Sequence, residues 1–355
     1  MLMLTSIPGV EIPVITLLLL GLSIGVLSGF TGVGGGFFVT PALIVMGMPV
    51  NLAVGTSLFW VFFNSLAGSI IHRNHGNSDI KLGIYIALPS LMGVEAGIQL
   101  ALYMRTLGVQ DVAILSVSIG LMTFIGAYTI IESLKRKDYL DQIGEERHLV
   151  SYLPTASARK LQGIQLPPLV HFNRAGVTVS LWIILILGFL IGVSTGFIGT
   201  GGGFIVVPAL VYLMGIPAVL AVGTSTMPVV LSSLYGGGRY LLSGNVVIVV
   251  ALVILSTSIP GVIYGASVTK YVRGVTIRMV LGMTILIVSA GAILKLGWLV
   301  SDKTLPILQS LANIVTIGGM LFSMVTVVLL KSISRRYRMG KRIPLWSESL
   351  FQQHL

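Results

Sequence analysis

The chain contains 355 residues, of which 55% are hydrophobic and only 9% are charged, and its mean hydropathy is +0.98. This composition excludes an ordinary soluble protein and indicates a protein embedded in a lipid bilayer. The net charge of +11 does not point to a nucleic-acid partner, because seven of the 22 Lys and Arg residues lie in residues 135–174 and six in residues 331–342.

Long apolar runs predict an all-α polytopic membrane protein. Each is close to the roughly 20 residues that cross a hydrocarbon core of ~30 Å. Two further runs, 37–48 and 204–214, would reach about half-way across at ~1.5 Å per residue. The first long run lacks the basic flank of a signal peptide, so we predict that it is retained. The nine predicted full spans are 12–30, 52–71, 82–104, 112–134, 177–196, 220–240, 246–268, 276–296 and 305–330.

An unusual segment occurs twice. GFTGVGGGFFVTPAL begins at Gly29 and GFIGTGGGFIVVPAL begins at Gly196, 167 residues later. Each copy continues to Ala-Val-Gly-Thr-Ser, and 20 of 29 aligned positions are identical when one extra residue is allowed in the second copy. Clustered glycines do not continue a helix well, and each cluster is followed by one of the half-length runs. We therefore predict two homologous repeats, each with a broken half-helix.

The duplication divides the chain into five parts. The first transmembrane repeat spans 12–134, a polar linker 135–176 and the second repeat 177–296. An additional span, 297–331, and a polar tail, 332–355, lie outside the duplication. Glycines spaced four apart in both repeats predict close helix packing. These glycines are Gly21, Gly25, Gly29, Gly93 and Gly97, with Gly188, Gly192, Gly196, Gly261 and Gly265 as their counterparts.

The basic linker and tail predict the topology, because Lys and Arg near span ends collect on the cytoplasmic side. Five long spans separate the two segments, so both reach that side only if the half-length run 204–214 counts as one crossing. Each repeat then has five segments, so the second repeat is inserted upside-down relative to the first. Parallel repeats with re-entrant half-helices are the alternative. We predict a multi-pass protein of the cell membrane with cytoplasmic linker and C-terminus.

The glycine clusters are the candidate substrate site. An unwound stretch survives in lipid only when it is buried in protein or lines a watery cavity. The helix N-terminus that follows offers unpaired N–H groups and partial positive charge, which suit an anion. The alternative is that the glycines only permit broken helices to cross. The candidate residues are Gly34, Gly35, Gly36 and Phe37 in the first copy, and Gly201, Gly202, Gly203 and Phe204 in the second.

Hydroxyl groups follow the half-helices in both repeats. Thr56, Ser57, Thr224 and Ser225 are candidate substrate ligands because both copies keep them. Bonding back to their own helix is the alternative. Asn64 and Ser65, with Ser232 and Ser233, are weaker candidates for the same cavity.

Glu95 is a carboxyl group in the middle of a predicted span, where charge is costly and is usually functional. It could carry a coupling proton, stay neutral, or pair with a basic residue on a neighbouring helix. The second repeat has Ile263 at this position, so any role of the carboxyl group is limited to the first repeat. Arg239, near a span end, is predicted to anchor the membrane interface.

The repeated G-x-G-G-G-F…P-x-L and A-x-G-T-S segments resemble those of the sulfite exporter TauE/SafE family, also called the toluene-sulfonate uptake permease family. The resemblance covers about residues 16–296. It implies a permease for sulfite, sulfoacetate, sulfonates or related sulfur anions, with proton coupling as one option. The long linker and the last span extend beyond the plainest family pattern.

These observations favour a secondary transporter of small anions that works by alternating access. An anion channel with the same broken helices is the alternative. The H-E-x-x-H motif does not occur, and we predict no enzyme activity, no metal site and no cofactor. Assembly into a homo-oligomer stays open.

Overall fold

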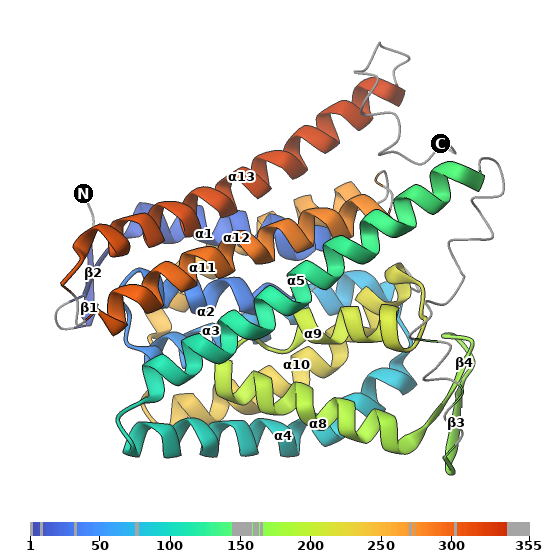
Figure 1. Cartoon of the computed structure of the whole chain (residues 1–355), viewed down its shortest axis with the longest axis horizontal. Coiled ribbons are helices and arrows are strands. Elements are labelled where there is room, and N and C mark those ends of the chain that lie inside the picture. The colour runs from blue at the N-terminus through green and yellow to red at the C-terminus, as the bar shows by residue number, and fades with distance from the viewer. Residues whose placement is uncertain are drawn as a thin grey trace.

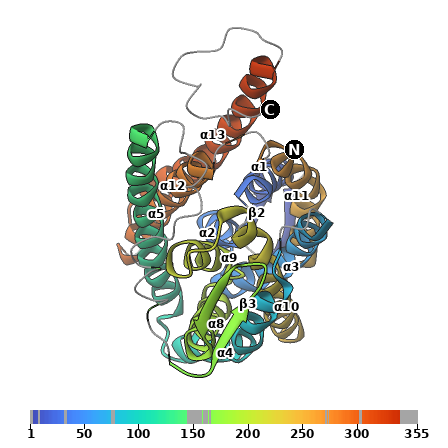
Figure 2. The same cartoon turned by 90° about the vertical axis from the view of Figure 1, so that its right-hand side faces the viewer.

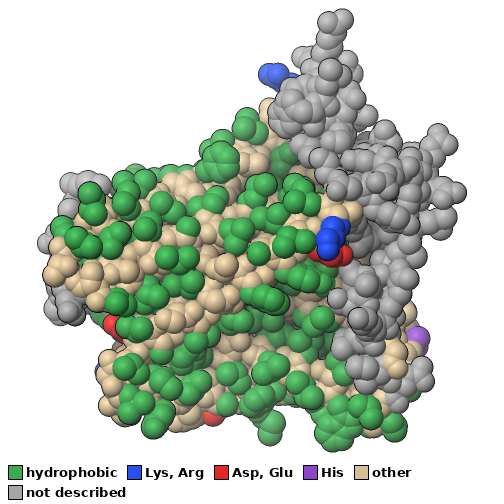
Figure 3. Space-filling model, in the orientation of Figure 1, with side chains coloured by type: hydrophobic (Ala, Val, Ile, Leu, Met, Phe, Trp, Pro, Cys, Tyr) green, Lys and Arg blue, Asp and Glu red, His purple; other side chains and the backbone are tan. Residues whose placement is uncertain are grey.

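A computed structural model describes residues 3–7, 10–31, 34–74, 78–143, 158, 163, 166–269, 272, 274–301 and 304–338. Eight of its helices are long and apolar enough to cross a membrane. The face in Figure 3 is covered mainly by hydrophobic side chains, as a lipid-facing surface requires. The predicted all-α polytopic fold is confirmed.

Nine long helices, two short ones and two β-hairpins make up the described chain (Figure 1). The short helices are α2 (Gly36–Val45) and α9 (Gly203–Pro208), which the π-helix η2 (Ala209–Leu213) continues. Each hairpin is antiparallel: β1 (Met3–Ile7) pairs with β2 (Val10–Pro13), and β3 (Leu169–Phe172) with β4 (Val177–Ser180). The long helices are α1 (Val14–Thr31), α3 (Val50–Asn74), α4 (Ile80–Thr106), α5 (Gln110–Ile143), α8 (Leu181–Ile198), α10 (Ala218–Leu242), α11 (Ile248–Thr269), α12 (Gly274–Val300) and α13 (Pro306–Arg338).

Several predicted boundaries move. The strands β2 and β4 precede the helices α1 and α8, so the spans predicted to begin at 12 and 177 begin at Val14 and Leu181. The helix α5 runs past the predicted linker boundary to Ile143, and α13 runs past the predicted tail boundary to Arg338. Residues 144–157, 159–162 and 164–165 of the predicted linker and residues 339–355 of the predicted tail lie outside the described residues.

The sixth predicted span, 220–240, corresponds to α10, which is 25 residues long. It is rich in glycine, serine and threonine, and it packs between α3 and α4. Small and polar residues suit a helix surrounded by other helices, because they allow close approach and internal hydrogen bonds.

The helix contacts recur when the first five helices, α1 to α5, are matched in order to α8 to α12. Helix α1 packs along α11, and α8 packs along α4 in the same way. A Cβ added at Gly25 would lie 2.2 Å from the carbonyl oxygen of Ser258, and one at Gly192 would lie 2.1 Å from that of Ser90. At both crossings, therefore, only glycine fits, and the glycine faces predicted from the sequence are packing faces.

Matched helices run in opposite directions. Helix α3 is antiparallel to its counterpart α10, because Gly237 lies beside Phe59 and Gly55 lies beside Tyr240. Inverted repeats produce this arrangement, whereas parallel repeats would give matched helices the same direction. The same holds for α5 and α12, where Gly126 lies beside Leu286 and Gly282 beside Ile130.

The two ends of the bundle carry different hairpins. In Figure 1, β1 and β2 lie at the left end, whereas β3, β4 and the C-terminal end of α13 lie towards the right. Figure 2 looks along the helices and places α2 and α9 inside the ring of longer ones. All ten residues of α2 are buried. Helix α2 is thus enclosed by protein rather than exposed to lipid, and Gly203 and Phe204 at the start of α9 are buried as well.

Candidate functional site

Both glycine clusters form sharp turns that lead into the half-helices. Gly35 caps α2 with a φ of 77°, and Gly202 caps α9 with a φ of 78°. A side chain is strained in this left-handed region, which explains glycine at both positions. The N–H groups of Phe38 and Ile205 bond to the carbonyls of Gly35 and Gly202, which closes the first turn of each helix.

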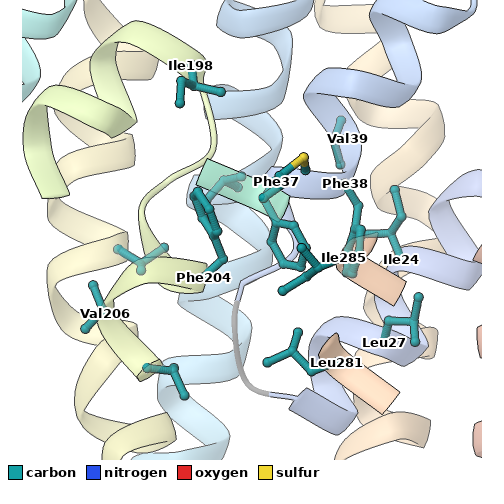
Figure 4. Packing of buried hydrophobic residues seen from close by; sticks show 14 of the residues in the cluster. Ile24, Leu27, Phe37, Phe38, Val39, Ile198, Phe204, Val206, Leu281 and Ile285 are labelled. Carbon is teal, nitrogen blue, oxygen red and sulfur yellow. The ribbon is translucent and has the colours of Figure 1, made fainter. Parts of the chain in front are cut away.

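The two turns touch each other in the middle of the bundle. A Cβ on Gly36 would lie 2.4 Å from the carbonyl oxygen of Thr200, in the second turn. The rings of Phe37 and Phe204 stack with centroids 5.3 Å apart (Figure 4). Both phenylalanines are buried. Their rings occupy the space between the half-helices, so a ligand cannot lie directly between the two aromatic side chains in this conformation.

The first N–H groups of α9 remain available. Among the described residues, no hydrogen bond uses the N–H of Gly203 or Phe204. Both residues are buried. Since α9 and η2 together form one short helix over 203–213, these donors lie at its partially positive end.

Thr56 and Thr224 cap helices. The Thr224 hydroxyl accepts a hydrogen bond from the N–H of Asp79, at the start of α4, at 2.9 Å. The Thr56 hydroxyl accepts one from the N–H of Val247, just before α11, also at 2.9 Å. Both threonines are fully buried. Their presence in both repeats is accounted for by two equivalent caps, without a ligand.

Replacing Thr224 by valine is expected to destabilise the protein by about 1–3 kcal/mol, because the buried N–H of Asp79 loses its acceptor. Thr224→Ser keeps the hydroxyl and is the matched control. Thermal unfolding in detergent measures the difference. Equal stability of the two variants would contradict the capping role.

The two serines that follow these threonines differ from each other. Ser57 donates a hydrogen bond to the carbonyl of Gly36, at 3.3 Å, and so contacts the first glycine turn. Ser225 donates to Val222 in its own helix. Of the repeated hydroxyl candidates, only Ser57 reaches a glycine turn through its side chain.

A small pocket with a cavity volume of about 20 Å³, partly open to the surroundings, lies over the first glycine turn. The sequence offered Asn64 and Ser65 as weaker candidates, and both line it. Thr226 was not among the sequence candidates. The signal for it is a third hydroxyl directly after Thr224 and Ser225, at a position where the first repeat has Leu58. The lining residues are Ser28, Gly29, Gly34, Asn64, Ser65, Gly68, Thr226, Val229 and Val262.

Glu95 forms an ion pair with Arg239. The Arg239 guanidinium donates two hydrogen bonds of 3.0 Å to the carboxylate, and Tyr235 and Gln99 donate further bonds of 2.8 and 2.7 Å. The side chains of Arg239 and Glu95 are 38% and 33% exposed. Of the three roles predicted for Glu95, the structure therefore shows pairing with a basic residue. Arg239, predicted to be an interfacial anchor, is that partner.

Arg239→Leu is expected to destabilise the protein by about 1–3 kcal/mol, a range between those of exposed and buried ion pairs. The loss arises because Glu95 keeps a charge without its partner. The double variant Glu95→Leu/Arg239→Leu removes both charges and should recover most of the stability. Thermal midpoints of the three proteins measure this coupling, and additive losses would argue against it.

Charged and metal-binding groups are otherwise scarce near the turns. No charged side chain lines the pocket. Within the described ranges, no group of three or more His, Asp or Glu side chains is placed to hold a metal ion.

Comparison with known proteins gives the family. The model of the sulfite exporter TauE/SafE family matches residues 17–292. The probable membrane transporter protein YjnA of Bacillus subtilis is 28% identical over 77% of this chain and 97% of its own length. YunE, of the same organism and the same description, is 24% identical over 77% of this chain and 95% of its own length.

A third relative is archaeal. The probable membrane transporter protein MJ0441 of Methanocaldococcus jannaschii is 27% identical over 63% of this chain and 71% of its own length. No solved structure matches the chain. The family match covers both glycine turns and the helices from most of α1 to most of α12. The chain is therefore a membrane transporter that belongs to the sulfite exporter TauE/SafE family.

Proposed function

We propose that this transporter is a carrier of small anions and that its substrate site lies at the paired glycine turns. The single observation that carries the proposal is the contact between Gly36 and Thr200, which joins the two turns inside the bundle. Unwound backbone at this depth is expected where a transporter binds its substrate. Free N–H groups at the start of α9 favour negative charge.

The substrate class follows from the family. Its description as sulfite exporters, together with a site that suits an anion, favours sulfite and related sulfur oxyanions over larger solutes. No charged side chain lines the pocket, so the hydrogen-bond donors there are neutral. These donors would replace the hydration water of the anion. Gly35 and Gly202 allow the left-handed backbone of the turn that leads into each half-helix.

Alternating access would come from rocking of one repeat against the other. The antiparallel packing of α3 on α10 and of α5 on α12 supports this mechanism, because inverted repeats can exchange their conformations. The basic linker and tail favour the cytoplasmic side for the end of the bundle that carries β3 and β4, in the cell membrane.

Uptake by proteoliposomes tests the proposal. Labelled sulfite, sulfoacetate and acetate are each offered with and without a proton gradient. A carrier predicts uptake of a sulfur anion that saturates with concentration. Flux that never saturates and follows the membrane voltage alone would favour the anion channel, and uptake of none of the three would overturn the proposal.

Glu95 is the candidate group for proton coupling, and Glu95→Gln tests that role. A coupling role predicts that the variant still equilibrates the anion across the membrane but no longer accumulates it in response to a proton gradient. Unchanged gradient-driven accumulation would leave Glu95 with the ion pair to Arg239 as its only role.

A further inference from the structure

The pocket over the first glycine turn contains polar atoms that the protein itself does not satisfy. Asn64 and Ser65 are 1% and 3% exposed, yet the Asn64 Oδ1 and Ser65 Oγ atoms have no hydrogen-bond partner among the described residues. Buried polar atoms are almost always paired, by protein, water or ligand. Two such atoms in one pocket mark a place where water or a ligand supplies the missing hydrogen bonds.

The orientation of the Asn64 amide is fixed. Its Nδ2 group donates to the Ser28 Oγ at 3.0 Å and to the carbonyl oxygen of Gly34 at 3.3 Å. A carbonyl oxygen accepts only, so a flipped amide would lose the bond to Gly34. The Oδ1 atom is thus left as an acceptor without a donor among the described residues.

The hydroxyl groups in the pocket supply donors. Ser28 accepts from Asn64, and no acceptor for its own hydroxyl hydrogen is present among the described residues. The Ser65 hydroxyl is unpaired. Thr226 donates to the carbonyl of Gly223 in its own helix, so its oxygen offers lone pairs rather than a hydrogen. The pocket therefore combines two donors with at least one acceptor that has no partner.

We propose that the substrate binds in this one pocket as a singly charged oxyanion that carries its own hydrogen-bond donor, such as hydrogen sulfite. The inference rests on the proposed function and specifies its substrate. Ser28 and Ser65 donate to unprotonated oxygens, and the Asn64 Oδ1 accepts the remaining O–H. A fully deprotonated dianion would face the lone pair of Oδ1 and place two charges in a pocket without a basic side chain.

The matching region of the second repeat does not provide the same site. Ser232 and Ser233, at the positions of Asn64 and Ser65, donate to Pro228 and Val229 in their own helix. Leu58 takes the place of Thr226 and lies 3.1 Å from a Cβ added at Gly236. An apolar side chain thus packs where the first repeat has its pocket. The binding site therefore occurs once, although the fold around it consists of two matching repeats.

Competition between two monoanions of similar size tests the proposal in the wild-type protein. Unlabelled hydrogen sulfite, offered at a pH where it predominates, and methanesulfonate, which has no donor, are compared as inhibitors of labelled sulfite uptake into proteoliposomes. We expect hydrogen sulfite to be favoured by about tenfold or more, the factor that one satisfied hydrogen bond contributes. Equal inhibition in the presence of saturable uptake would overturn the proposal and leave the carrier function standing.

Variants assign the discrimination to Asn64. Asn64→Leu removes the acceptor at similar size and should reduce the preference to about twofold or less, whereas Ser232→Ala, its counterpart in the second repeat, should keep it. Asn64→Asp adds a negative charge and should weaken inhibition by both anions. Should Asn64→Leu not fold, Asn64→Asp decides. Full retention of the preference in Asn64→Leu, or undiminished inhibition by both anions in Asn64→Asp, would contradict the assignment.

Discussion

Replacing Gly192 by alanine is expected to destabilise the protein by about 3 kcal/mol, although it adds only one methyl group. The added Cβ would lie 2.1 Å from the carbonyl oxygen of Ser90 and 2.9 Å from the Cα of Gly93. These are backbone atoms of α4, so no side chain can move aside and the two helices must separate. The thermal midpoint and the monodisperse fraction in detergent measure the effect.

Gly120→Ala is the matched control for this variant. Gly120 lies in the interior of α5, and a Cβ there meets no atom within 4 Å. Alanine also has the higher helix propensity, so this variant should be neutral or slightly stabilised. Equal thermal midpoints for the two variants would show that α4 and α8 do not pack as closely as described.

Gly35→Val and Gly202→Val are each expected to abolish anion binding while still giving protein inserted in the membrane. Both positions have a left-handed backbone that a β-branched residue rarely adopts. A Cβ at Gly35 would also lie 2.9 Å from both Ile24 and Trp60. The turn must therefore shift, and uptake should fall by at least about tenfold, the factor that 1.4 kcal/mol represents.

Gly47→Val is the control that shows whether backbone strain alone, away from the proposed site, reduces anion uptake. Gly47 has a φ of 96°, but a Cβ there meets nothing within 4 Å, and the residue lies after α2 rather than before it. The variant should lose some stability and keep its affinity for the anion. Normal uptake by Gly35→Val and Gly202→Val would exclude the turns from the site.

The sequence predicts the helical membrane fold well because the apolar runs and the duplicated segment are long and distinct. It also predicts that glycines such as Gly25 and Gly192 pack against another helix. It cannot predict which helix, because a small-residue face lets any backbone approach. The structure pairs α1 with α11 and α8 with α4, so each repeat completes the other.

Repetition is a good guide to the fold and a poorer guide to the pocket. Thr56 and Thr224 occur in both copies because each caps a helix of the opposite repeat. Asn64 and Thr226 have no equivalent residue in the other repeat, yet they line the pocket. Comparing the two repeats finds the residues that both need for folding. It does not find the residues of a pocket that occurs only once in the fold.

The role of Glu95 is also one that the sequence alone does not determine. Its position in an apolar run predicts a special role, but the sequence leaves three roles open. The choice depends on α10, which brings Arg239 and Tyr235 to the carboxylate from about 140 residues away. Such a contact follows from the tertiary arrangement of α4 and α10 and from no local pattern.

Solute counterflow tests the central claim, a carrier with one anion site exposed alternately to each side, most directly. Proteoliposomes are loaded with excess unlabelled sulfite and diluted into a trace of labelled sulfite, without a proton gradient or a membrane voltage. A carrier exchanges one anion for another, so the label should accumulate transiently above its equilibrium level. A monotonic approach to equilibrium without this overshoot would contradict the account.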